Sequence, residues 1–404
     1  MKYSKEEVKQ YVEEEDVKFI RLAFCDVFGK QKNISIMPDE LDRAFEYGIT
    51  FDASSVKGYG DETHSDLFLK PDSATLMALP WRPEHGRVIR MFSDVTYPSG
   101  EAYACDTRSL LKKAVKDAGD LGISFYFGAE QEFYLFELDQ NGRPTRKTHD
   151  EAGYMDIAPD DKGENIRREI CLTLEQMGIR PESSHHEEGP GQNEIDFRYS
   201  DPMTAADNVM TFQTAVRTIA YRNGLHADFT PKPIENLPGN GFHINMSVKS
   251  TDGQDYLPQI IAGVLDKAAD MTAFLNPVKA SYYRFGSDKA PQYVSWSTEN
   301  RSQLIRIPAA FGEYRRAELR SPDPTANPYL AFTLIIYAGL DGIKNQLKLP
   351  DPADFNLYTA NTEILDSYKR LPGTLKAACS LAKHSTFIKE HIPEAVLDIY
   401  CGNS

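Results

Sequence analysis

The sequence predicts an α+β protein with a small N-terminal domain and a larger domain behind it. A capped helix followed by an alternating strand opens the chain, as expected of a small α+β unit. A linker-like segment with Pro98, Ser99 and Gly100 follows, and beyond it helices with recognisable stops alternate with strands. We therefore expect domains over residues 1–100 and 101–404.

The composition excludes several classes of protein. With 404 residues, 41% hydrophobic and 26% charged, the chain has room for a large core. Its longest apolar runs fall short of the roughly 20 residues that span a bilayer, and no signal-peptide pattern opens it, so a cytoplasmic protein is expected. A net charge of -15 disfavours nucleic acid.

The cysteines indicate neither a disulfide framework nor a zinc site. They are odd in number and scattered, without CxxC spacing, and we expect them to be reduced. They are Cys25, Cys105, Cys171, Cys379 and Cys401.

The expected elements follow from local signals. Ser4 and Glu7 form a capping-box pattern that opens a helix to about Glu15, residues 17–24 alternate as a strand does, and residues 67–79 are strand-rich. The segment 95–104 is the expected linker. Further helices are predicted over residues 106–121, 165–177, 202–223, 327–344 and 375–390, the first three ending before a glycine.

The segment 125–136 (FYFGAEQEFYLF) carries the first chemical signal. Its alternation places Glu130, Glu132 and Tyr134 on one strand face, with the two carboxylates about 6–7 Å apart. A solvated strand face is the simpler reading of this segment alone. Three further segments that repeat the pattern make a functional face the better interpretation.

Those segments offer acids, a histidine and arginines to a common space. SSHHEEGPGQNEIDF places Glu187 and Glu194 around a Gly/Pro turn, GNGFHINMS aligns His243, Asn245 and Ser247, and RAELR aligns Arg316, Glu318 and Arg320. Such a set suits two hard divalent cations, with the arginines holding phosphates and a substrate carboxylate. A two-metal phosphatase or nuclease is the competing interpretation of the bare acid cluster.

Longer blocks resemble the class I glutamine synthetase family. GAEQEF, HHEEGPGQNEIDF, GNGFH, NRSQLIRIP, RRAELRSPDPTANPYLAF and AGLDGIKN look like its signature blocks, FDASS and GYMDIAP resemble two more, and the similarity runs from about Tyr3 to Gln346. The resemblance implies a β-grasp-like N-terminal domain and a catalytic domain with a curved antiparallel sheet, a half-barrel, flanked by helices. It also implies an ATP-dependent ligase that forms glutamine from glutamate and ammonia through a γ-glutamyl phosphate.

The resemblance assigns roles residue by residue. It implies two Mg²⁺ or Mn²⁺ ions, one on Glu132, Glu187 and Glu194 and one on Glu130, His243 and Glu318. It implies substrate binding by Gly239, Arg284, Arg301 and Arg320, and ATP binding by Tyr199, Asn245, Ser247, Arg306 and Arg316. Asp52 from an adjacent subunit would take a proton from ammonium, in a pocket that Tyr154 completes, while Arg301 would act on the transferring group.

The chain departs from the family pattern beside the amine pocket. Lys289 stands where the family has a flap glutamate, with Asp288 as the alternative occupant, and Pro238 stands where an asparagine is usual. A γ-glutamyl-amine ligase with another acceptor is therefore the first alternative to glutamine synthetase. A non-catalytic homologue is the second, although the intact metal set argues against it.

The resemblance also implies assembly. Because Asp52 would act in a neighbour's site, we expect a homo-oligomer, a hexameric ring. The family's longer C-terminal tail has no counterpart after Ser404, so stacking of rings into a dodecamer is expected to be weak or absent.

Overall fold

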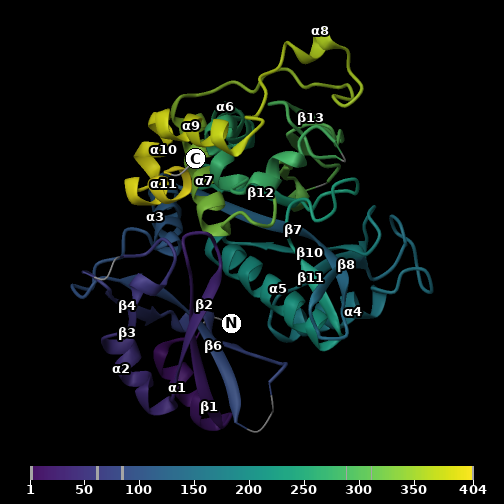
Figure 1. The fold of residues 1–404 in the computed structure, drawn as a ribbon. Coiled ribbons are helices and arrows are strands. Elements are labelled where there is room, and N and C mark those ends of the chain that lie inside the picture. The colour runs from purple at the N-terminus through teal and green to yellow at the C-terminus, as the bar shows by residue number, and fades with distance from the viewer. Residues whose placement is uncertain (1–2, 61–62, 83–85, 288, 311, 403–404) are drawn as a thin grey trace. The chain divides into compact units, whose positions relative to one another are not determined.

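A computed structural model describes residues 3–60, 63–82, 86–287, 289–310 and 312–402 of the chain. It contains two compact units, Met1–Lys112 with Gln176–Gly178 and Lys113–Glu175 with Ile179–Ser404, called unit 1 and unit 2. Each is described by itself (Figure 1).

Unit 1 is a sheet of short and medium strands with two helices. The sheet has the order β2-β1-β6-β4-β3, with β5 paired to β6, and its only parallel pair within the described residues is β1 with β6. Its elements are α1 (Lys5–Glu14), β1 (Val17–Cys25), β2 (Gln31–Ile36), α2 (Leu41–Glu46), β3 (Ile49–Asp52), β4 (Asp66–Pro71), β5 (Met77–Ala78) and β6 (Arg87–Thr96).

The start of unit 1 follows the sequence signals. Ser4 Oγ accepts the backbone N–H of Glu7 at 3.2 Å, and the Glu7 carboxylate accepts the backbone N–H of Ser4 at 2.7 Å, which confirms the capping box. The expected linker differs, because β6 continues to Thr96 and the isolated bridge between Thr96 and Ala102 orders the segment further. The Pro-Ser-Gly signal itself forms a turn, in which the Gly100 N–H donates to the Tyr97 carbonyl at 2.9 Å.

Unit 2 is built on a nine-stranded sheet covered by long helices. The sheet has the order β13-β14-β15-β12-β7-β10-β9, and β8 and β11 also pair with β7. Its strands are β7 (Ile123–Leu138), β8 (Pro144–Thr148), β9 (Pro181–His186), β10 (Gln192–Ser200), β11 (Leu225–Asp228), β12 (Phe242–Ser250), β13 (Trp296–Thr298), β14 (Ile305–Ile307) and β15 (Ala317–Leu319).

The later helices include all five that the sequence predicts after the N-terminal one, with one interruption. The helices that follow β6 in the chain are α3 (Thr107–Asp120), α4 (Glu164–Gln176), α5 (Pro202–Arg222), α6 (Leu257–Leu275), α7 (Pro328–Lys344), α8 (Thr362–Leu365), α9 (Leu375–His384), α10 (Thr386–His391) and α11 (Glu394–Cys401). The predicted helix over 375–390 is divided at Ser385, whose extended backbone ends α9 and whose hydroxyl accepts the N–H of Ile388 to cap α10.

The long strand β7 separates the core from a polar face. Phe127 stacks on Phe332 of α7 with ring centres 4.3 Å apart, and Phe133 packs edge-on against Phe212 of α5. Alternation then turns Glu130 and Glu132 to the face opposite these helices, as predicted. Packing of the apolar face of β7 on the helices thus fixes the position of the acids on its polar face.

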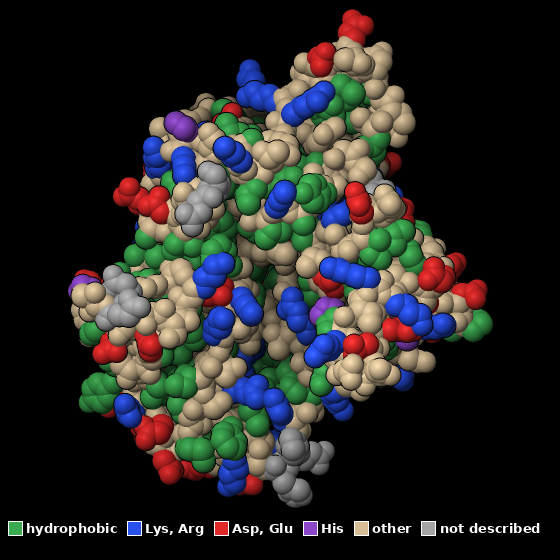
Figure 2. Space-filling model, viewed as in Figure 1, with side chains coloured by type: hydrophobic (Ala, Val, Ile, Leu, Met, Phe, Trp, Pro, Cys, Tyr) green, Lys and Arg blue, Asp and Glu red, His purple; other side chains and the backbone are tan. Residues whose placement is uncertain are grey.

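Within the described residues, no helix is both long enough and apolar enough to cross a bilayer. On the face shown in Figure 2, Lys and Arg side chains are interspersed with Asp and Glu side chains.

Candidate functional site

The sheet register brings the predicted acids and the histidine into rows across neighbouring strands. Glu130 of β7 lies opposite His243 of β12 on one side and Asp196 of β10 on the other. Glu132 lies opposite Glu194, which in turn lies opposite His185 of β9. Residues far apart in sequence therefore share one sheet face because their strands pair antiparallel in this register.

A third row brings arginines to the same place. Glu318 of β15 pairs with Asn245 of β12 and with Arg306 of β14. Its fully buried carboxylate accepts from Arg306 Nη1 at 2.8 Å and from Arg320. These charge-assisted bonds satisfy an acid that would otherwise be costly to bury.

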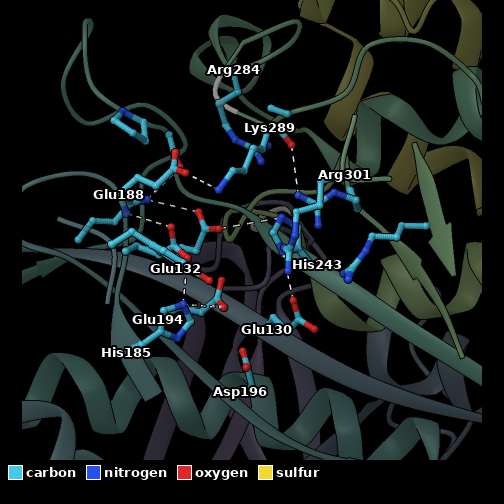
Figure 3. A pocket seen from close by; sticks show the side chains of 18 of the residues that line it. Glu130, Glu132, His185, Glu188, Glu194, Asp196, His243, Arg284, Lys289 and Arg301 are labelled. Atoms are coloured by element: carbon cyan, nitrogen blue, oxygen red, sulfur yellow. Dashed lines mark hydrogen bonds and ion pairs between the residues drawn. The ribbon is translucent and has the colours of Figure 1, made fainter. Parts of the chain in front are cut away.

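Above these rows lies a pocket of about 300 Å³ that is lined by both acidic and cationic side chains (Figure 3). Most of the predicted metal, substrate and phosphate residues line it. The predicted residues in its lining are Glu130, Glu132, Tyr154, Glu187, Glu194, Gly239, His243, Arg284, Lys289, Arg301, Arg306, Arg316 and Arg320. Glu318 is not part of this lining and lies within 3.6 Å of His243 Nδ1.

The acids of the pocket perturb one another strongly. Burial opposes ionisation of Glu130, but the hydrogen bond and charge of His243 and the amide of Asn245 outweigh it and lower the Glu130 pKa to about 2. Burial raises the pKa of Glu194 well above its usual range, as does repulsion by Asp196 and Glu132. Burial and the charge of Glu130 likewise raise the pKa of Asp196. A cation would relieve this crowding.

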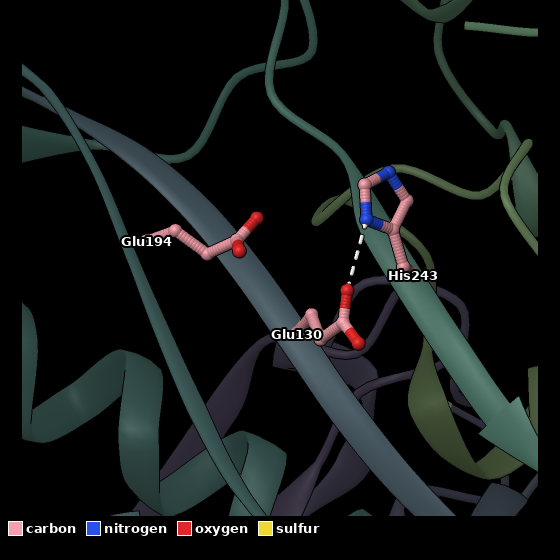
Figure 4. Close-up of side chains that lie close together, drawn as sticks. All are labelled: Glu130, Glu194 and His243. Atoms are coloured by element: carbon pink, nitrogen blue, oxygen red, sulfur yellow. Dashed lines mark hydrogen bonds and ion pairs between the residues drawn. The ribbon is translucent and has the colours of Figure 1, made fainter. Parts of the chain in front are cut away.

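Two groups of ligand atoms are compact enough to hold a metal ion. The first is Glu130, Glu194 and His243 (Figure 4), and the second is His185, Glu187 and Glu194; within each, the ligand atoms lie within 4.8 Å of one another. Glu194 is only 7% exposed, and its nearest cationic partner among the described residues is His185 at 3.7 Å. Carboxylate and imidazole donors with an unmatched buried acid fit hard divalent cations.

The grouping differs from the division that the resemblance implies. Glu194 lies in both compact groups, whereas one Glu132 oxygen accepts the backbone N–H of Gly241 at 2.6 Å and its other oxygen is 4.0 Å from His243 Nε2. The structure thus places the predicted ligands around one space, without dividing them into two separate triads.

The predicted substrate residues lie on the loop side of the pocket. Arg284 is 3% exposed and donates from Nη1 to the carbonyl of Ser321 at 3.0 Å. Gly239 packs so closely that a Cβ there would lie 2.5 Å from the Pro231 carbonyl oxygen and 2.7 Å from Arg284 Cγ. Only glycine fits without displacing the arginine.

A second cavity of about 250 Å³ holds the remaining predicted ATP residues. Tyr199, Asn245, Ser247 and Arg316 line it. Arg316 donates from Nε to Asn245 Oδ1 at 2.8 Å, which fixes the guanidinium between the two cavities that it lines. Glu130 and Asp196 also line both, so the cavities adjoin at these three residues.

The departures from the family pattern cluster at one wall. Lys289 forms an ion pair with Glu188, and its Nζ lies 5.2 Å from the centre of the Tyr154 ring. Lys289 has a left-handed backbone with φ 62°, a conformation uncommon outside glycine. The Pro238 carbonyl accepts from the Tyr134 hydroxyl at 2.7 Å. The predicted alternative, Asp288, lies outside the described residues.

Asp52 belongs to unit 1 and is placed at the end of β3. Its carboxylate accepts from the backbone N–H of Ser54 at 3.0 Å and from the hydroxyls of Ser54 and Ser55. The hydrogen bond from the Ser54 hydroxyl, followed by that from Ser55, lowers the Asp52 pKa. The FDASS sequence thus holds an exposed, ionised carboxylate in a fixed orientation.

Three ionisable pocket residues were missed by the sequence reasoning. Asp196 and His185 lie two residues from Glu194 and Glu187, respectively, and line the pocket with them. The period-2 rule applied to EID and HHE would have found both. Glu188 follows β9, where no strand periodicity applies, so only its ion pair with Lys289 identifies it.

Comparison with protein families identifies both parts of the chain. Residues 16–98 match the glutamine synthetase β-grasp domain, and residues 104–403 match the glutamine synthetase catalytic domain. Glutamine synthetase from Clostridium saccharobutylicum is 43% identical, over 99% of this chain and 94% of its own length. The Methanosarcina mazei enzyme is 43% identical over 98% and 92%, and that of Staphylococcus aureus strain Mu50 is 42% identical over 96% and 91%.

Solved structures agree with this fold. A GmaS–ADP complex superposes with a TM-score of 0.88 at 26% identity, covering 97% of this chain and 93% of that one. Plasmodium falciparum glutamine synthetase, at 22% identity, gives a TM-score of 0.87 over 100% and 95%. The predicted β-grasp domain and curved catalytic sheet flanked by helices are confirmed. The chain belongs to the glutamine synthetase family of ATP-dependent carboxylate–amine ligases.

Proposed function

We propose that this protein forms glutamine from glutamate and ammonia through a γ-glutamyl phosphate intermediate. The observation that supports this best is a single pocket in which a set of acids faces a set of arginines. The relatives that match nearly the whole chain at 42–43% identity are glutamine synthetases. Transfer of a phosphoryl group from ATP to a carboxylate requires acids that bind divalent cations and arginines that bind the anionic groups.

The roles within the pocket follow the chemistry of each side chain. Glu130, Glu132, Glu187, Glu194, His243 and Glu318 would hold two divalent cations, which would neutralise the transferring phosphoryl group and orient its oxygens. Arg284 and Gly239 would bind the amino-acid end of glutamate. Arg301 and Arg320 would stabilise the negative charge of the transferring phosphoryl group, and Arg306 would contact the ATP phosphates.

The second cavity would hold the nucleotide. Tyr199 and Ser247, which line this cavity, would contact the base and ribose, and Arg316, which donates to Asn245, would contact the phosphates from the junction. The similarity to a GmaS–ADP complex at 26% identity supports nucleotide binding in this fold.

The proposed reaction has two steps. A γ-carboxylate oxygen of glutamate attacks the γ-phosphorus of ATP, the bond from that phosphorus to the bridging oxygen breaks, and ADP leaves. The nitrogen of ammonia then attacks the acyl carbon, the bond from that carbon to the phosphate oxygen breaks, and phosphate leaves. A carboxylate near the nitrogen must accept the surplus proton.

Asp52 is the proposed proton acceptor, supplied by an adjacent subunit beside Tyr154. Its hydrogen bonds from Ser54 and Ser55 keep it ionised, as a base for ammonium must be. This role requires a homo-oligomer, for which we propose a hexameric ring. Light scattering of the active enzyme tests it, and a fully active monomer would contradict both the shared site and the ring.

One assay tests the proposed reaction directly. ATP, glutamate, Mg²⁺ or Mn²⁺ and ammonium should yield ADP, phosphate and glutamine in equal amounts. Phosphate release that does not depend on glutamate would instead indicate an ATPase or phosphatase. Absence of turnover with every amine would favour the non-catalytic homologue.

A second candidate function, ligation of glutamate to a different amine, is favoured by the wall around Lys289. A lysine stands there in place of the family's proton-accepting flap glutamate. Loss of a general base typically slows a reaction by about 10²- to 10⁴-fold. Its pairing with Glu188 weakens its repulsion of cationic amines. An acceptor bearing its own carboxylate could exchange with Glu188 at Lys289. The same assay with methylamine and small amino acids as acceptors distinguishes the two functions.

A further inference from the structure

Asp196 is a pocket carboxylate that the roles proposed above leave unassigned. It lies on β10 directly opposite Glu130 of β7, on the side away from His243 (Figure 3). With Glu130 and Arg316 it lines both the acid pocket and the second cavity. Asp196 therefore lies where the proposed cation site and the proposed nucleotide site meet.

The charge of Asp196 is not matched by the protein groups around it. Ser183 Oγ donates to Oδ2, whereas Oδ1 is buried and has no hydrogen-bond partner among the described residues. Arg316, which also lines both cavities, donates to Asn245 Oδ1 at 2.8 Å instead. Leaving a buried carboxylate oxygen unpaired costs free energy, and Glu130 beside it adds repulsion.

Glu194, on the same face of β10, is a second acid without a close cationic partner. It is 7% exposed, and among the described residues its closest cationic contact is His185 at 3.7 Å, longer than a hydrogen bond. The arginines Arg306 and Arg320 do not neutralise Glu194, because both pair with Glu318. Among the described residues, neither Glu194 nor Asp196 thus has a cationic side chain within hydrogen-bond distance.

We propose that Asp196 holds, directly or through a coordinated water, a divalent cation that is bound jointly with the phosphates of the nucleotide. Asp196 lies outside the compact ligand groups, so it cannot complete a cage made of protein atoms alone. Mg²⁺ commonly takes only one or two carboxylates together with substrate phosphates and waters, which suits a carboxylate at the junction of two cavities. This inference rests on the proposed nucleotide site.

The test is the thermodynamic coupling between Mg²⁺ and ADP. Calorimetry should show that saturating Mg²⁺ tightens ADP binding to the wild-type protein, and that Asp196→Asn reduces this tightening by about tenfold, the scale on which groups around a bound metal act. Without Mg²⁺, Asp196→Asn should bind ADP at least as well as the wild type, because a repulsive charge is removed. The Asn variant keeps the size and the hydrogen bond to Ser183.

Glu175→Gln is the matched control. Glu175 is an exposed acid of α4 that lines neither cavity, so its loss changes the net charge equally but should leave the coupling unchanged. Equal weakening of ADP binding by Asp196→Asn with and without Mg²⁺ would mean that Asp196 contacts the nucleotide itself. Unchanged coupling would mean a structural carboxylate, and either result overturns the proposal.

The experiment also separates this inference from the function on which it rests. If the wild-type protein shows a cooperative thermal unfolding transition but binds no ADP under any condition, the proposed nucleotide site is wrong. If ADP binds and is tightened by Mg²⁺ equally in both proteins, only the role of Asp196 is wrong.

Discussion

Two adjacent histidines, His185 and His186, belong to two polar clusters of similar composition and different character. His186 is fully buried, with Nδ1 2.7 Å from the Glu187 carbonyl and Nε2 2.9 Å from Asp150 Oδ1. His185 points to the pocket, where its Nε2 lies 3.1 Å from Glu187 and 3.7 Å from Glu194. Strand alternation sends the two imidazoles to opposite faces.

The carboxylates of the enclosed cluster (Asp150, Asp161, Arg167, His186) are fully hydrogen-bonded. Every carboxylate oxygen has a donor: Asp150 accepts from His186 and the backbone N–H groups of Gly191 and Lys162, and Asp161 accepts from Gly163 and Arg167. The pocket cluster leaves oxygens of Glu194 and Asp196 without such donors among the described residues.

The difference shows what separates a structural cluster from a binding site. Both Asp150–Asp161–His186 and Glu130–Glu194–His243 are compact enough to hold an ion. Compactness therefore does not distinguish them, whereas hydrogen-bond satisfaction does, because a carboxylate with all its donors gains little from a cation. We expect substitutions in the two clusters to have opposite effects on activity and stability.

The largest effect is expected from removing a pocket ligand. Glu132→Ala or His243→Ala should abolish ATP-dependent turnover, since even groups that only support metal ligands contribute about 10- to 100-fold. The melting temperature without metal should change little, because these side chains face the pocket. Phosphate release and thermal unfolding measure the two quantities, and near-normal activity at limiting Mg²⁺ would refute the metal assignment.

The enclosed cluster should respond in stability instead. Asp161→Ala removes one partner of a buried pair, with Arg167 4% exposed and an Nη2–Oδ2 distance of 2.5 Å, and should lower the free energy of unfolding by about 3–5 kcal/mol. Denaturant titration measures this loss. Glu137→Ala, which breaks the exposed pair with Lys147, is the control and should change stability little.

Acid should destabilise the enclosed cluster at a defined pH. Burial opposes ionisation of Asp150, but the hydrogen bonds from His186 and Gly191 outweigh it and lower its pKa from 3.8 to about 2. A lowered folded-state pKa gives stability that is present above pH 4 and is lost as the pH falls towards 2. Asp150→Asn should flatten the dependence of unfolding free energy on pH in that window, and an unchanged slope would contradict it.

The smallest effect is expected from the ion pair between Lys289 and Glu188, because both side chains are partly exposed to solvent. If Lys289 slows ammonium use by its charge, Lys289→Glu should improve turnover with ammonium, and Lys289→Ala should change it little if Asp288 is the base. Glu188→Gln is the matched test, because freeing Lys289 should weaken ammonium use about two- to fivefold, within the range of an exposed ion pair. Efficient ammonium use that Lys289→Glu destroys would show that the flap has been misread.

Much of the fold was predictable because local signals and tertiary packing agree. The capping box at Ser4 and the alternation around Glu130 both appear as expected, since each is a short-range pattern that packing reinforces. The break at Ser385 was not predicted, because a serine reads equally well as a helical surface residue or as a cap. The extension of β6 to Thr96 depended on partner strands that the sequence does not name.

The sequence alone determined which residue types face the pocket, because a period of two assigns Glu130, His243 and Glu194 to strand faces whatever the partners are. Only the tertiary structure decided which acids meet. Register placed Asp196 beside Glu130, and tertiary packing brought Asp150 to His186, because one strand's periodicity carries no information about its neighbour's alignment. Likewise, the ion pair between Lys289 and Glu188 depends on two loops about 100 residues apart in the chain, whose approach no local pattern encodes.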